Sequence, residues 1–178
     1  DPVDVLLRVA QEEHQLHVQA AVVPQRAPAG KCTDSGLAAF SMTPHVWPIR
    51  WIAFHAFTSA RPHTPDAFAH KGVAVFEVTH ARVPIRVATF HLQATYATTP
   101  QRAQAQDRDI RLQQFTEAIQ NAVEHHVLIC GGDVNAEQEE DLHAFDTVVS
   151  RLTHNKGRRL QHDGGTTCAA SGVSTAKW

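Results

Sequence analysis

The sequence predicts an α/β domain with a mixed sheet, and three patterns support this fold class. Residues 73–78 and 85–91 are strand candidates with many β-branched side chains, and they are joined by a short link around Arg82, which is typical of an antiparallel hairpin. A pattern of apolar residues at steps of three and four begins after Pro100 and indicates a long helix. A compact apolar strand and a second helical pattern follow, and strands that alternate with helices are typical of α/β folds.

The first half of the chain predicts one helix and two strands ahead of the hairpin. Residues 3–18 have an imperfect apolar stripe that indicates an amphipathic helix. Two prolines and a glycine then interrupt regular structure, and residues 37–41 form a short apolar run that predicts a buried strand. Residues 49–57 are rich in aromatic and β-branched side chains, which favours a further strand.

The second half predicts a helix, a strand, a second helix and a loop. The apolar positions of the first of these helices are Leu112, Phe115, Ile119, Ala122 and Val123. Residues 127–130 predict a strand that ends in two glycines and Asp133. The next helix has acidic residues 137–141 near its start, where the helix dipole favours negative charge, and its apolar positions are Leu142, Phe145, Val149 and Leu152. Residues 153–178 are polar and glycine-rich, which indicates a loop.

Composition indicates a single globular domain over residues 1–178, without repeats. The chain is 43% hydrophobic and 19% charged, which excludes disordered and collagen-like classes. Its net charge of −2 supplies no positive field toward nucleic acid or an anionic membrane. No apolar run is long enough to cross a bilayer, and the sequence starts at Asp1 without a recognisable targeting signal, so the compartment stays open.

Polar residues follow predicted strands at three places and form the candidate site. His91 ends the apolar run of residues 87–90, where an imidazole can donate a hydrogen bond to a phosphoryl oxygen or transfer a proton. Asp133 and Asn135 follow two glycines, which let the backbone turn tightly near a ligand, and their alternation sends both side chains the same way if the strand pleat persists. A carboxylate and an amide on one face suit a hard cation such as Mg²⁺.

Each of these features also has a purely structural interpretation. A histidine at a strand end is often held by a neighbouring backbone group, and Asp and Asn are common in turns and helix caps. Lys71 precedes a predicted strand and can neutralise a phosphate, with Asp66 five positions upstream, yet a solvated loop lysine is the more common case.

Five motifs taken in order give the sequence a family resemblance. They are Asp34-Ser-Gly-Leu-Ala-Ala-Phe-Ser41, His70-Lys-Gly-Val73, Thr89-Phe-His-Leu-Gln93, Arg111-x-x-Gln114 and Gly131-Gly-Asp-Val-Asn135. In this order they resemble the endonuclease/exonuclease/phosphatase superfamily, which has the DNase I-like fold. Within it the motifs are most similar to those of neutral sphingomyelinases.

The resemblance implies a four-layered sandwich of mixed sheets flanked by helices and a Mg²⁺-dependent phosphodiesterase. It implies that His91 binds the scissile phosphate, that Asp133 and Asn135 hold the phosphate, the water and the metal, and that Lys71 and Asp66 lie near the substrate head group. The expected reaction is hydrolysis of sphingomyelin to ceramide and phosphocholine, with the sphingolipid at a membrane surface as partner.

The sequence departs from the family pattern at both ends. Family members have a metal-binding Glu on an early strand and an Asp-His motif near the end, and neither is present here. The chain is therefore interpreted as a fold incomplete at both ends. Two alternatives stay open: a nuclease or inositol-phosphate phosphatase of the same superfamily, with nucleic acid disfavoured by the lack of basic excess, or a non-catalytic remnant of the fold.

Overall fold

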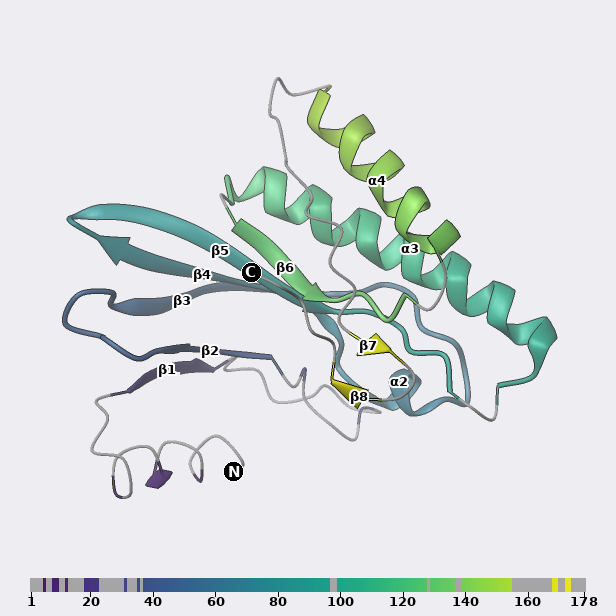
Figure 1. Cartoon of the computed structure of the whole chain (residues 1–178), viewed down its shortest axis with the longest axis horizontal. Coiled ribbons are helices and arrows are strands. Elements are labelled where there is room, and N and C mark those ends of the chain that lie inside the picture. Colours follow the sequence, from purple (N-terminus) through teal and green to yellow (C-terminus); the bar gives the residue numbers. More distant parts are fainter. Residues whose placement is uncertain are drawn as a thin grey trace.

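The computed structural model of the chain describes residues 5, 8–9, 12, 18–22, 31, 35, 37–96, 99–127, 129–136, 139–154, 168–169 and 172–173. Strands and helices alternate along this part of the chain, which confirms the predicted α/β class (Figure 1). The elements are β1 (Gln19–Val22), β2 (Ala38–Ser41), β3 (Ile49–Ala56), α2 (Pro65–Phe68), β4 (Gly72–His80), β5 (Val83–His91), α3 (Gln101–Glu124), β6 (Ile129–Asp133), α4 (Glu139–His154), β7 (Cys168–Ala169) and β8 (Gly172–Val173).

The central sheet has the strand order β3-β4-β5-β6 and is mixed, as predicted. β3 and β4 pair antiparallel, β4 and β5 form the predicted hairpin, and β5 and β6 run parallel. The hairpin turns at Ala81 and Arg82, both of which have positive φ, 48° and 67°. Two successive residues with positive φ match the right-handed twist of the paired strands, so this turn keeps β4 and β5 in register.

The central sheet is covered on both faces (Figure 1). α3 and α4 lie over one face, where Val73 and Val75 of β4 are fully buried in one hydrophobic cluster with α3. Ala74 and Phe76 point to the opposite face and form a second cluster, against which Ala39 of β2 packs. Because successive strand residues face opposite sides, a segment buried on both faces is apolar at consecutive positions, and this explains the apolar run of residues 73–76 in β4.

The N-terminal part differs from the prediction in one added strand. β1 was not expected, and it pairs antiparallel with β2 from Gln19↔Ser41 to Val22↔Ala38. The Gln19 side chain donates to the Ile49 carbonyl and accepts from the Ile49 amide, both at 2.9 Å, so it joins this pair to β3. Phe40 of β2 is 41% exposed, which corrects the expected buried strand, because β2 is covered on one face only.

The predicted helix over residues 3–18 falls largely outside the described residues. Those of its residues that the structure describes as helical are Val5, Arg8, Val9 and Glu12. Both predicted helices of the second half are confirmed, and they pack together through Phe115 and Phe145, whose ring centroids are 4.5 Å apart. The predicted loop over residues 153–178 needs correction, because α4 continues to His154 and β7 pairs with β8.

β6 is shifted relative to its prediction. It begins at Ile129 and continues through both glycines to Asp133, in parallel register with β5 from Val87↔Ile129 to His91↔Asp133. A Cβ atom at Gly132 would overlap the backbone of Phe90, so this glycine allows the two strands to approach closely. The glycines therefore belong to the strand, and the turn predicted at them is wrong.

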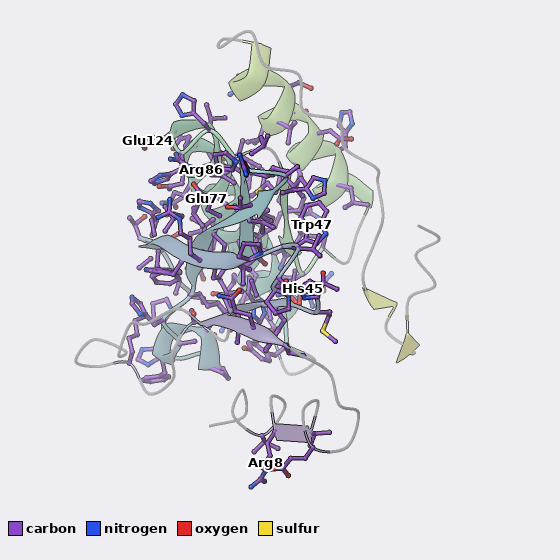
Figure 2. All side chains as sticks on the ribbon, turned by 90° about the vertical axis from the view of Figure 1, so that its left-hand side faces the viewer. Arg8, His45, Trp47, Glu77, Arg86 and Glu124 are labelled. Carbon is purple, nitrogen blue, oxygen red and sulfur yellow. The ribbon has the colours of Figure 1, made fainter. Side chains whose placement is uncertain are left out.

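Ion pairs connect neighbouring strands of the sheet, and a hydrogen bond joins the sheet to the end of α3, in the region of Glu77 and Arg86 (Figure 2). Glu77 of β4 binds Arg50 of β3 at 2.8 Å and lies 3.9 Å from Arg86 of β5. Arg86 also donates to the carbonyl of His125 at 2.8 Å.

Among the described residues, no helix is long and apolar enough to cross a membrane.

Candidate active site

The candidate site begins where the parallel strands β5 and β6 end side by side. Their last residues, His91 and Asp133, are register partners, and the His91 Nε2 to Asp133 Oδ2 distance is 3.8 Å. Their side chains are 40% and 41% exposed. Ligands of open α/β sheets bind outside the carboxyl ends of the strands, so this exposed pair is in a position to contact a ligand.

Asn135 reaches the same edge through a turn. The Asp133 Oδ1 atom accepts a hydrogen bond from the Asn135 backbone N–H at 2.9 Å, and Asn135 has a φ of 49°. The pleat therefore ends at Asp133, which corrects the reason given for Asn135 pointing to the site. Its side chain is oriented instead by its own Nδ2, which donates to the Leu92 carbonyl at 2.9 Å. This bond leaves the amide oxygen available to a ligand.

Lys71 and Asp66 lie directly behind this edge and are buried. The Lys71 Nζ atom donates to the Leu92 carbonyl at 2.7 Å and forms an ion pair with Asp66 Oδ1 at 2.8 Å. Asp66 also accepts from the Tyr96 hydroxyl at 2.9 Å and from the Ala94 amide at 2.7 Å. The structure thus brings all five predicted site residues together, with three at the surface and two beneath them.

Electrostatics favour the neutral form of His91. Burial lowers its pKa, the nearby Lys71 ammonium lowers it further, and the carboxylates of Asp133 and Asp66 act in the opposite direction. Burial also lowers the pKa of Lys71, against its hydrogen bond and attraction to Asp66. Burial together with Asp66 raises the pKa of Tyr96 to about 12, so the phenol stays protonated and donates to Asp66.

A buried polar network supports the segment that follows His91, and the sequence reasoning did not assign it a role. Gln114 of α3 accepts from the Gln93 amide at 2.7 Å, and the Gln93 side chain accepts from the Arg61 amide at 3.1 Å. The Arg61 guanidinium lies 2.9 Å from the carboxylate of Asp107. Three buried polar residues of α3 recur at helical spacing: Asp107, Arg111 and Gln114. Polar residues in the buried stripe of a helix need hydrogen-bond partners, and this pattern is the signal that could have revealed the network.

The oxygen donors at the edge fit part of a magnesium site. Asp133 and Asn135 carry hard oxygen ligands at one partly exposed edge, and Mg²⁺ uses one or two carboxylates together with water and substrate phosphates. Within the part of the chain that the structure describes, no group of three or more His, Cys, Asp or Glu side chains could hold a metal ion. Asp133 and Asn135 would therefore supply two of the oxygen ligands of a bound Mg²⁺.

Comparison with solved structures shows which known fold the chain has. No protein-family model matches the sequence, and no curated protein matches it. A magnesium-bound beta toxin mutant from Staphylococcus aureus is 20% identical with a TM-score of 0.60, and sphingomyelinase C from Streptomyces griseocarneus is 16% identical with a TM-score of 0.54. The chain has the DNase I-like fold.

The match covers most of this chain and about half of each solved structure. It includes 82% of this chain in both cases, and 52% of the beta toxin and 51% of the sphingomyelinase. A third structure, SmcL, is 22% identical with a TM-score of 0.53, and the match covers 73% of this chain and 46% of SmcL. The fold predicted from the motifs is therefore confirmed, and the chain spans about half the length of these structures.

Proposed function

We propose that this chain is part of a Mg²⁺-dependent phosphodiesterase that acts at the edge formed by β5 and β6. The observation that carries the proposal is that His91, Asp133 and Asn135 lie at one partly exposed edge, with His91 and Asp133 in direct register. Phosphoryl transfer requires positioning and neutralisation of charge more than covalent chemistry by the protein, and an imidazole, a carboxylate and an amide supply both.

Each side chain has a distinct role in this proposal. The neutral imidazole of His91 donates a hydrogen bond to a non-bridging phosphoryl oxygen. Asp133 and Asn135 would hold Mg²⁺, which when bound neutralises phosphoryl charge and lowers the pKa of a coordinated water. The Asp133 Oδ2 atom lies 3.8 Å from His91 Nε2, which is too far for a hydrogen bond, so the carboxylate acts on the imidazole through its charge.

Sphingomyelin is the substrate that we propose for this site. Water attacks phosphorus and loses a proton, the bond between phosphorus and the ceramide oxygen breaks, and that oxygen takes up a proton, so that ceramide and phosphocholine are released. Two solved structures of the same fold carry the names sphingomyelinase C and beta toxin, and the net charge of −2 does not favour a polyanionic substrate such as nucleic acid.

Lys71 and Asp66 are proposed to lie near the phosphate of the substrate. In the conformation described here the Lys71 ammonium already binds Asp66 and the Leu92 carbonyl. A direct contact with substrate therefore requires Lys71 to exchange one of these partners for a phosphate oxygen. Without that exchange, the ammonium acts on the phosphate only through its charge.

Hydrolysis assays on three substrates test the proposal. Sphingomyelin, bis(p-nitrophenyl) phosphate and plasmid DNA are each incubated with the full-length protein that contains this chain and with Mg²⁺, with EDTA as the control. We expect metal-dependent release of phosphocholine, and we expect His91→Ala to lower kcat by roughly 100-fold or more. His143→Ala changes an exposed histidine of α4 and is expected to keep full activity.

Three outcomes would reject part or all of this function. Plasmid cleavage without sphingomyelin hydrolysis would replace the lipid substrate by nucleic acid. Full activity of His91→Ala would remove the assigned role of the imidazole. Hydrolysis of none of the three substrates would favour a non-catalytic domain of the same fold.

A further inference from the structure

One peptide group connects the candidate site to the interior of the protein. The carbonyl of Leu92 and the N–H of Gln93 belong to the same peptide and point in opposite directions, because the bond is trans. The carbonyl oxygen accepts from Asn135 Nδ2 at 2.9 Å and from Lys71 Nζ at 2.7 Å. The N–H donates to Gln114 Oε1 at 2.7 Å, so α3 holds the inner end of the peptide.

The chemistry of Gln114 is dictated by its two partners. A backbone N–H can only donate and a backbone carbonyl can only accept, so Oε1 faces Gln93 and Nε2 donates to the Ser59 carbonyl at 2.6 Å. The side chain of Gln114 is 1% exposed and lies beside Phe115 and Ala118 in the buried stripe of α3. An apolar residue would pack in this stripe without an amide to satisfy, and it would leave two backbone groups unpaired.

We propose that Gln114 is a positioning residue for Asn135 and acts through the peptide between Leu92 and Gln93. The peptide plane is rigid, so rotation about it moves the carbonyl that orients the Asn135 amide and breaks the bond to Gln114 at the same time. A hydrogen bond to the N–H also polarises the peptide and strengthens its carbonyl as an acceptor, especially in a buried environment. Gln114 thereby fixes where the Asn135 amide oxygen points.

The catalytic consequence of this inference rests on the proposed function, and its structural part does not. If Asn135 binds the metal or the phosphate, a loosened Leu92 carbonyl lowers turnover. If the chain hydrolyses no phosphodiester, Gln114 still orients Asn135. The experiment therefore follows the Asn135 amide directly and measures activity separately.

The test uses two-dimensional NMR on the ¹⁵N-labelled chain of 178 residues. Asn135→Asp identifies the side-chain NH₂ signals of Asn135. We expect Gln114→Met to move these signals and to accelerate exchange of the Gln93 amide hydrogen by about fivefold to tenfold, the effect of losing one ordinary hydrogen bond. Gln113→Met is the matched control, because Gln113 lies on the same helix and binds Thr58 and Glu117 at the surface; it is expected to leave the signals in place.

Gln114→Glu separates positioning from packing. A protonated carboxyl group offers one acceptor and one donor and reproduces both bonds of the amide, whereas the ionised form cannot donate to Ser59. We expect the Asn135 signals of this variant to match the wild type at low pH and to move toward those of Gln114→Met as the new carboxyl group ionises. If Gln114→Met does not fold, the recovery of the wild-type Asn135 signals in Gln114→Glu at low pH still tests whether Gln114 positions Asn135.

Two results would overturn the inference. One is an Asn135 signal that stays at its wild-type position in Gln114→Met and at all pH values in Gln114→Glu. The other is an equal displacement in Ala122→Gly, which destabilises α3 away from the peptide. In an active protein we further expect Gln114→Met to lower kcat by roughly 10-fold to 100-fold with KM little changed. An inactive wild type would reject the proposed function and leave the NMR result to decide the positioning role.

Discussion

At the scale of single residues, the sequence identifies Lys71 as a candidate, but only the structure shows which groups its ammonium contacts. The sequence marks a cation next to a strand, and the structure buries its ammonium between Asp66 and the Leu92 carbonyl. Asp66 receives three donors in all, so this carboxylate holds Tyr96 and Ala94 as well as the lysine. The bonding partners come from elements distant in sequence, and no spacing rule could have named them.

Removing the Lys71 charge should destabilise the protein strongly. Lys71→Met leaves the Asp66 carboxylate buried without its cation, and breaking a buried pair costs about 3 kcal/mol or more of the free energy of unfolding. Urea denaturation measures the change. Lys71→Met combined with Asp66→Asn should recover part of the loss, because the second substitution removes the uncompensated charge.

Arg50→Met serves as the control for this prediction. Arg50 forms an ion pair with Glu77 of the same length, 2.8 Å, but its side chain is 66% exposed. The Glu77 side chain is only 10% exposed, but it keeps the Arg86 guanidinium 3.9 Å away when Arg50 is replaced, so the variant should lose at most about 1 kcal/mol relative to the wild type. Equal stability of Lys71→Met and the wild type would show that the buried pair does not stabilise the fold.

The parallel pairing of β5 with β6 creates the site at the scale of secondary structure elements. The two strands are separated in sequence by α3, and their register places His91 opposite Asp133. Gly132 permits this approach, since a side chain there would meet the backbone of Phe90. The sequence showed the glycines but assigned them to a turn, because only the neighbouring strand reveals what a missing Cβ makes possible.

Two alanine substitutions in β6 test the importance of this close approach. Gly132→Ala should lower the free energy of unfolding by about 1–3 kcal/mol, because the new methyl group overlaps Phe90 and the strands must separate. Gly131→Ala is the matched control, because no atom lies within 4 Å of its Cβ position. Thermal or urea unfolding compares them, and an equal effect of both substitutions would contradict this account of Gly132.

At the scale of the whole molecule, the central sheet is covered on both faces, and two of the histidines around it, His70 and His55, have pKa values lowered by burial. His70 is buried next to the ring of Phe54, and its Nδ1 atom has no hydrogen-bond partner among the described residues. Burial and the charge of Lys31 lower its pKa. Burial and His125 lower the pKa of His55, while Glu124 acts in the opposite direction. Both histidines are therefore more readily protonated in the unfolded chain.

Stability should decrease in mild acid. In the unfolded chain both histidines titrate near the ordinary value of 6.5, and in the folded protein they titrate lower, so the unfolded state binds more protons between these values. The stabilisation is present above pH 6.5 and is lost as the pH falls toward the folded-state values. Calorimetry should therefore show a lower Tm at pH ~5.5 than at pH ~7.5.

His70→Phe tests the contribution of one histidine to this pH dependence. The substitution keeps an aromatic ring against Phe54 and removes the titrating group, so the decrease in Tm between the two pH values should be smaller than in the wild type. His143→Phe alters an exposed histidine of α4 and should keep the wild-type decrease. An unchanged decrease in His70→Phe would exclude His70 as a cause.

The sequence alone determined the fold class, the hairpin, the two long helices and the identity of the five candidate site residues. These features depend on local periodicity, on turn residues and on ordered motifs, all of which are visible along one chain. The tertiary structure alone decided the β1–β2 pair, the true extent of β6 and the turn that brings in Asn135. It also decided which side chains hold the Leu92–Gln93 peptide, because hydrogen bonds between distant elements depend on packing in three dimensions and leave no fixed spacing in the sequence.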